Sequence, residues 1–336
     1  MGFTHRTMVF SKPVYIQSSG TAVGPKEGAG PLKGSFDYVY DDLWCGEKSW
    51  ELAERALMKT AINQCLKKRH KSIDTIDLFI AGDLNNQTTV SSYVARDLQL
   101  PYIGTYSACA TSIEALILGS IWINGLLADH VLTAASSHYG VCEKQFRFPT
   151  EFAVQKSESA QLTVTGAGSV LLSKKRSQIQ VTEATIGRVI DFGLLDANQL
   201  GAAMAPAAAE TTVAHLSKTN KHVSDYDLIL TGDLSKTGSE IYRKLLREHG
   251  HYLSKGYEDC GVMIYGTEQK AFAGGSGAGC SASVVFGHVF NQIIAGELNR
   301  VLVIATGALL SSITVNQKQS IPAIAHAIAF ERRDFS

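Results

Sequence analysis

The sequence predicts an α/β protein built from two duplicated halves, in which two sheets of buried strands enclose central helices. The first observation is a repeat, because IDLFIAGDL (76–84) matches YDLILTGDL (226–234) at an offset of 150 residues. The second is that HVLTAASSHYG (130–140) matches RVLVIATGALL (300–310) at an offset of 170 residues. Both pairs are nearly continuous apolar runs of strand length, which is typical of strands buried on both faces. An internal duplication of this kind predicts two similar structural units.

The third observation is a pair of apolar helices at corresponding places in the two halves. SIEALILGSIWINGLL (112–127) corresponds to SVVFGHVFNQIIAGEL (283–298). The first is apolar nearly all round, and a helix of this kind is buried on all sides. We therefore expect it to lie between two sheets, in a layered α-β-α-β-α sandwich, with an N-terminal half at 1–184 and a C-terminal half at 185–336.

The elements of the first half follow from their own patterns. Residues 11–48 are rich in glycine, proline and aromatic side chains, which predicts a long ordered loop that buries those aromatics. Apolar residues at helical spacing predict a helix from Trp50 to Lys68, and a second helix is expected near Ser91–Leu98. Between them, residues 76–84 form the first predicted strand.

Composition excludes several classes of function. Lys plus Arg and Asp plus Glu both number 31, so the net charge is zero and we expect no binding to nucleic acid. No apolar run reaches membrane-spanning length without interruption, so a soluble protein is expected. The six cysteines form no C-x-x-C pair, and the histidines form no ligand motif, so neither a metal site nor a cofactor is predicted. The low charge favours a homodimer.

The segment GTYSACATSIE (104–114) is the main candidate site, because Cys109 stands where a short extended run meets the apolar helix. Unpaired N–H groups and the helix dipole at such a position lower a thiol pKa and make a nucleophile. The same N–H groups also bind anions without any chemistry. The sequence around Cys109 leaves both alternatives open.

A family resemblance rests on these motifs. The duplication, the cysteine before a buried helix, TVTGAGSVLLS (163–173) and FAGGSGAG (272–279) resemble the thiolase-like superfamily, and the catalytic motifs resemble its ketoacyl synthases. Over its whole length the chain further resembles the stage V sporulation protein AD family of endospore-forming bacteria. That resemblance rests on SGTAVGPKEGAGPL, AGDLNNQ, KQFRFPTE, GLLDANQLGAAMAPAAAE, DLILTGDLS and IPAIAHAIAFER.

The resemblance also implies two catalytic partners that this sequence lacks. In the synthase III branch a histidine should fall within 228–241, where the sequence offers Gly232 or Asp233 instead. An asparagine should fall within 273–283, where Ser276 is the nearest polar residue. Losing a general base typically lowers a rate by roughly 10²–10⁴. We therefore expect no condensing activity.

Two histidines could still approach the cysteine. His326 lies in the segment that corresponds to the family's terminal glycine-rich strand, beside the oxyanion hole. His138 ends the strand that follows the cysteine helix. For each, the alternative is a structural role, in the core for His326 and at the surface or a dimer interface for His138.

The remaining candidates are carboxylates, hydroxyls and cations. Asp83 and Asp233 end the two repeated strands, where α/β sheets bind ligands, although capping the next turn is an equally good role for both. Ser107 and Thr111 flank Cys109. A dicarboxylate ligand would need a cation, for which Arg147 between two phenylalanines is preferred over Lys144, Arg188 and Lys26.

The function that the resemblance implies is binding of dipicolinic acid, with or without calcium, and its uptake into the developing spore. The implied partners are membrane proteins of the same uptake machinery, and the implied place is the forespore, at the spore inner membrane. The expected ligand-binding residues are Cys109, Ser107, Thr111, His138, His326, Ser276, Asp83, Asp233 and Arg147. The first alternative is an acyltransferase or thioesterase that uses Cys109 with His326 on acyl-CoA-like thioesters. The second is a scaffold that only docks membrane partners.

Overall fold

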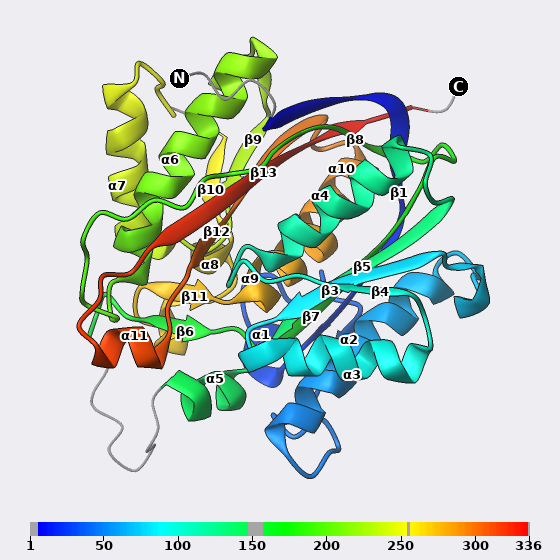
Figure 1. Cartoon of the computed structure of the whole chain (residues 1–336), viewed down its shortest axis with the longest axis horizontal. Coiled ribbons are helices and arrows are strands. Elements are labelled where there is room, and N and C mark those ends of the chain that lie inside the picture. The colour runs from blue at the N-terminus through cyan, green and yellow to red at the C-terminus, as the bar shows by residue number, and fades with distance from the viewer. Residues whose placement is uncertain (1–5, 147–156, 254–255, 335–336) are drawn as a thin grey trace.

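Two similar sets of five strands form the centre of the molecule (Figure 1). The computed structural model describes residues 6–146, 157–253 and 256–334. The first set has the order β4-β3-β5-β7-β1, and the second has the order β10-β9-β12-β13-β8. In each set three neighbouring strands are parallel and the next two are antiparallel, so the topology is repeated.

The strand bounds confirm the repeat that the sequence predicts. The strands of the first set are β1 (Thr7–Val23), β3 (Leu78–Asp83), β4 (Tyr102–Gly104), β5 (His130–Ser137) and β7 (Gly166–Ser173). Those of the second set are β8 (Ile179–Thr185), β9 (Leu228–Thr231), β10 (Tyr257–Asp259), β12 (Arg300–Ala308) and β13 (Ala323–Arg332). The short strands are β2 (Tyr38–Val39), β6 (Gln161–Thr163) and β11 (Gly274–Ser276). The predicted pairs of matching strands are therefore β3 with β9 and β5 with β12.

Helices complete the five layers. Outer helices α2 (Trp50–Lys67) and α3 (Thr89–Leu98) cover the first set of strands, and α6 (Leu200–Thr219) and α7 (Ser235–Glu248) lie on the other side of the molecule (Figure 1). The two sets are not the separate sheets that the sequence predicts, because β1 pairs with β8 and joins them into one 11-stranded sheet. Between the two sets lie α4 (Thr111–Asn124) and the continuous helix made of α9 (Ala278–Ser283), a π-helical segment (Val284–Val289) and α10 (Phe290–Ala295). The short helices are α1 (Pro25–Gly28), α5 (Tyr139–Phe146), α8 (Cys260–Met263) and α11 (Ser312–Asn316).

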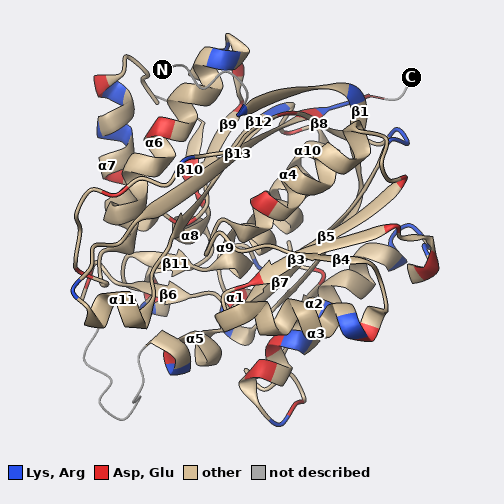
Figure 2. Cartoon of the chain, in the orientation of Figure 1, with Lys and Arg blue, Asp and Glu red and all other residues tan. Residues whose placement is uncertain are grey.

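The central helix α4 packs against strands of both sets, as its apolar surface predicts. It carries a single charged residue, Glu114, and Figure 2 shows charged residues mainly on the outer helices and loops. The layered thiolase-like fold is therefore the one that the sequence predicts. The domain boundary at 184/185 stays a prediction, since β8 pairs with β1 of the first set and with β13 of the second.

The prediction for residues 11–48 is wrong at its start, because β1 is a 17-residue strand that ends at Val23. Pro13 is tolerated because the pairing of β1 with β8 is interrupted between Val9 and Val14, so no N–H is needed there. Gly20 allows helix α2 to pack closely, since a Cβ at Gly20 would lie 2.1 Å from the carbonyl oxygen of Ala61. Of the aromatics expected to be buried, Phe36 is buried, but Trp44 and Tyr38 are 47% and 43% exposed.

One central helix has the length and hydrophobicity of a membrane-spanning helix. Ala278–Ala295 is long and apolar enough by length and composition, but 72% of it is buried inside the fold. It is the central helix that packs beside α4, as in the core of a soluble protein. The fold itself therefore accounts for its hydrophobicity.

Candidate functional site

Cys109 lies on a tight turn between β4 and the first residue of α4. Ala108 has φ 50°, a left-handed conformation that costs a non-glycine residue about 1 kcal/mol. The Thr111 hydroxyl braces this turn, because it accepts from the Ser107 N–H at 3.1 Å and donates to the Ala108 carbonyl at 2.6 Å. Thr111 is thus fully buried and engaged within the turn, while Cys109 remains partly exposed.

The second half of the chain supplies the environment of the thiol. The Asp233 carboxyl group, which follows β9, lies close enough to Cys109 for its negative charge to act on the thiol. It is held in place by the Thr306 hydroxyl at 2.7 Å and by the Gly277 N–H at 3.1 Å. Gly277 has φ 109°, and a Cβ there would lie 2.6 Å from a serine hydroxyl, so glycine is required. Elements from both repeats therefore meet at the thiol.

The electrostatics of this pair favour a protonated thiol. Burial raises the pKa of Asp233 to about 7, in spite of the hydrogen bonds that stabilise its anion. Burial, and then the negative charge of Asp233, raise the pKa of Cys109 well above the usual value for a thiol. The Cys109 thiol is therefore protonated at pH 7. The helix N-terminus does not activate this cysteine.

His326 lies on β13 beside the cysteine turn, but both of its ring nitrogens are occupied. Nδ1 accepts from the Gly187 N–H at 3.2 Å, so the proton is on Nε2, which faces the Ser107 hydroxyl at 3.1 Å. Burial lowers the pKa of His326 to about 4, so the ring is neutral at pH 7. His326 therefore supports the cysteine turn through its contact with Ser107. In the described part of the chain no hydrogen bond joins the thiol to a histidine.

The other predicted histidine, His138, does not reach the thiol. Its Nε2 is 2.7 Å from the Leu43 carbonyl, and its Nδ1 accepts from the Gly140 N–H at 3.1 Å. The ring is fully buried, and burial lowers its pKa. His138 thus holds the segment before α2 against the end of β5, inside the fold and not on its surface.

The two repeated aspartates differ in role. Asp83 accepts hydrogen bonds from the Asn85 N–H at 2.9 Å and from the Ser91 N–H and hydroxyl, both at 2.7 Å. It therefore caps the turn before α3, which is one of the two roles considered for it. Asp233 instead points to the cysteine, and the capping in the second half comes from Asp259. The duplication preserves the position but not the function of the side chain.

Ser276 and the described candidate cations make contacts that do not involve Cys109. Ser276 is buried on β11, where its carbonyl accepts from the Val164 N–H. Arg147 lies outside the described residues. The other candidates lie on other contacts: Lys144 pairs with Glu51, Arg188 pairs with Glu210, and Lys26 lies over the Tyr265 ring.

A cavity of about 440 Å³ lies next to the cysteine turn. Its described lining carries no charged side chain and consists of Asn85, Asn86, Gln87, Thr88, Tyr106, Gln145, Phe146, Leu309, Leu310, Ser311, Ser312 and Ile313. Tyr106 joins it to the site, since burial and then the nearby Cys109 raise the pKa of Tyr106 to about 12. Gln87 and Thr88 are both left-handed, with φ 62° and 50°, and such strain clusters at functional sites. The cavity suits a small ligand with polar and planar apolar parts.

Sequence reasoning missed several residues of this site. Thr306 and Gly277 orient Asp233, and only their places in the repeat could have suggested them. Glu114 was visible as the one charge in an apolar helix. Glu54, buried in α2, binds Ser136 and Asn85, and burial with the Asp83 charge raises its pKa to about 8.

Comparison with solved structures defines the class of protein. A variant of Xanthomonas campestris OleA superposes with a TM-score of 0.62 at 14% identity, over 96% of this chain and 99% of that one. Human mitochondrial 3-ketoacyl-CoA thiolase gives 0.62 at 11% identity, over 97% and 100%. The 3-oxoacyl-[acyl-carrier-protein] synthase III of Aquifex aeolicus gives 0.56 at 13% identity, over 97% and 99%. The chain thus has a thiolase-like fold.

Sequence comparison then gives the family. Residues 4–331 match the model of the family "Stage V sporulation protein AD (SpoVAD)". Stage V sporulation protein AD of Bacillus subtilis (strain 168) is 49% identical over 327 residues, which are 97% of each chain. This chain belongs to the stage V sporulation protein AD family, as the sequence motifs predict.

Proposed function

We propose that this protein acts in sporulation, where it binds dipicolinic acid beside Cys109 and takes part in its uptake into the developing spore. Membership of the family and the name of its Bacillus subtilis relative support the sporulation role. In this proposal the protein works in the forespore as a homodimer at the spore inner membrane, next to membrane proteins of the uptake machinery.

The observation that carries the proposal is the position of Asp233, a buried acid whose negative charge raises the pKa of the Cys109 thiol. A thiolase-type reaction needs a thiolate and a base that takes its proton. Here the partner is an acid that disfavours the thiolate, and the only histidine next to the turn, among the described residues, has both nitrogens in use. The arrangement therefore supports binding better than covalent catalysis.

The charge of the cavity bears on the form of the ligand. Its described lining is uncharged. A free dicarboxylate anion would gain no ion pair from this lining, and burying an unpaired charge is costly. The calcium chelate brings its own cation and needs no metal ligands from the protein. The calcium chelate is therefore the preferred ligand.

Calorimetry tests this proposal with dipicolinate alone and with equimolar calcium. We expect saturable binding that is tighter with calcium. Tyr106→Ala should weaken it by about fivefold or more, because an aromatic contact with the pyridine ring is lost. Tyr252→Ala removes another exposed tyrosine, outside the cavity lining, and should bind as the wild type does. No heat from either ligand at millimolar concentration refutes the proposal.

The second candidate is a Cys109-dependent acyltransferase or thioesterase. The observation in its favour is that Cys109 is partly exposed just before the first residue of α4, where free backbone N–H groups of a helix can stabilise an oxyanion. Incubation with acyl-CoA of several chain lengths, followed by intact-mass measurement, distinguishes the two. An acyl adduct on the wild type that is missing from Cys109→Ala would support the enzyme.

A further inference from the structure

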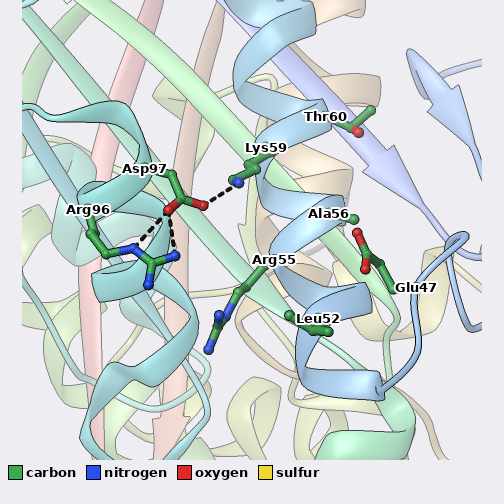
Figure 3. Close-up of a pocket in the computed structure, with 8 residues that line it drawn as sticks. All are labelled: Glu47, Leu52, Arg55, Ala56, Lys59, Thr60, Arg96 and Asp97. Carbon is green, nitrogen blue, oxygen red and sulfur yellow. Dashed lines mark hydrogen bonds and ion pairs between the residues drawn. The ribbon is translucent and has the colours of Figure 1, made fainter.

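A second cavity, of about 310 Å³, lies between the outer helices α2 and α3, on a face unrelated to Cys109 (Figure 3). Its charged lining is Arg55, Lys59 and Glu47 on or before α2, and Arg96 and Asp97 on α3. The three cations extend into the groove between the helices, while Glu47 lies on the other side of α2, beside Ala56. The space between the two helices therefore faces three cations and one carboxylate, Asp97, and carries a net positive charge.

Arg55 is the unusual member of this group. No carboxylate pairs with it in the described parts of the chain, and its buried Nε has no hydrogen-bond partner. The acidic residues next to it on α2 are already engaged, Glu51 with Lys144 and Glu54 with Asn85 and Ser136. An arginine is always charged, so a donor left without an acceptor in this way is costly.

The guanidinium group of Arg55 is nevertheless held in place. Its Cζ lies over the Tyr93 ring, 3.9 Å from the ring centroid, and the Arg96 Cζ lies 4.7 Å from the same centroid. Stacking of this kind orients the planar group and limits its rotamers, so little entropy is lost when an oxyanion binds. Among the residues that the structure describes, Asp97 is the one carboxylate that pairs with Lys59 and Arg96, which leaves N–H donors of both cations available.

We propose that this groove binds a phosphate group, with Arg55 as its main donor and Lys59 and Arg96 as further donors. Three cationic side chains from two helices suit a tetrahedral oxyanion, which offers acceptors in several directions, whereas a carboxylate is saturated by one bidentate arginine. The phosphate belongs either to a small phosphorylated molecule or to the headgroup of an anionic phospholipid. This site is independent of the function proposed for the Cys109 cavity.

Two parallel arms separate these sources. The first measures binding of glycerol 3-phosphate by calorimetry. The second measures co-flotation with vesicles of phosphatidylglycerol and phosphatidylcholine, against vesicles of phosphatidylcholine alone. Binding in the first arm assigns a small molecule, and binding only to the anionic vesicles assigns the lipid headgroup.

Matched variants decide whether the groove is responsible. Arg55→Gln should weaken binding by about tenfold or more, the usual effect of losing a charged hydrogen bond. Arg247→Gln removes the same charge from an exposed position of α7, on the opposite side of the molecule, and should have no effect (Figure 1). Arg96→Gln gives an independent test if Arg55→Gln unfolds. Absence of binding in both arms, or equal losses for the groove variants and Arg247→Gln, would overturn the proposal.

Discussion

The substitution Asp233→Asn should make Cys109 more reactive, because it removes a negative charge that disfavours the thiolate. In the wild type the carboxyl group has a pKa of about 7, so it is almost fully ionised at about pH 8.5 and opposes a second negative charge on sulfur. The asparagine amide oxygen can still accept a hydrogen bond, so the change removes charge more than it removes packing.

The size of the effect follows from the repulsion between the two negative charges when the sulfur is ionised. At an effective dielectric constant of about 20, two unit charges about 4 Å apart repel by about 4 kcal/mol. One third of that energy, about 1.4 kcal/mol, already changes the thiolate population by about tenfold. We therefore expect Cys109 of Asp233→Asn to be alkylated at least about ten times faster than that of the wild type at about pH 8.5.

Intact-mass spectrometry after timed exposure to iodoacetamide measures this rate. The other five cysteines are buried, so the first adduct reports Cys109, and its loss in Cys109→Ser confirms the assignment. Asp129→Asn removes a remote exposed carboxylate that pairs with Lys174, and it should label as the wild type does. Labelling of Asp233→Asn at the wild-type rate or below would show that Asp233 does not control the thiol.

Two further predictions concern the support of the cysteine turn. His326 has a pKa lowered to about 4, so it stays neutral in the folded state while the unfolded chain protonates below about pH 6.5. Stability should consequently fall by about 3 kcal/mol between pH 7 and 4 through this group, and urea unfolding should show a smaller loss for His326→Gln; equal losses would contradict it. Gly307→Ala should destabilise the fold by about 2 kcal/mol, because the new Cβ would lie 2.1 Å from the Ser107 carbonyl oxygen. An unchanged melting temperature would show that the turn can move aside at no cost.

The fold was predictable because the repeated segments are apolar runs of strand length, which can be recognised in the sequence. The pairs β3 with β9 and β5 with β12 depend on runs of buried residues, which the chain shows directly. Strand β1 was not predictable in the same way. Its glycine and Pro13 are local loop signals, and only the packing of α2 and a gap in the pairing with β8 make them compatible with a strand.

The sequence indicates the turn around Cys109 as the candidate site, but neither all of its neighbours nor its chemistry. The repeat indicates that Asp233 replaces the missing histidine, but Asp83 holds the corresponding place and only caps a turn. Likewise, the position of His326 beside Cys109 follows from the family pattern, whereas its neutrality depends on the Gly187 N–H, which no motif marks. The sequence does not mark Arg55 as a binding residue. Glu51 and Glu54 lie near it on α2, and only the structure shows that both are paired with other residues.

The central claim is that the cavity beside Cys109 is a ligand-binding site and not a catalytic one. Its most direct test is the rate of Cys109 alkylation with and without calcium dipicolinate, followed by intact mass at about pH 8.5. The structure predicts that the ligand slows the alkylation in a saturable manner, because it occupies the cavity next to the thiol. Alkylation at an unchanged rate in the presence of saturating ligand would contradict the claim.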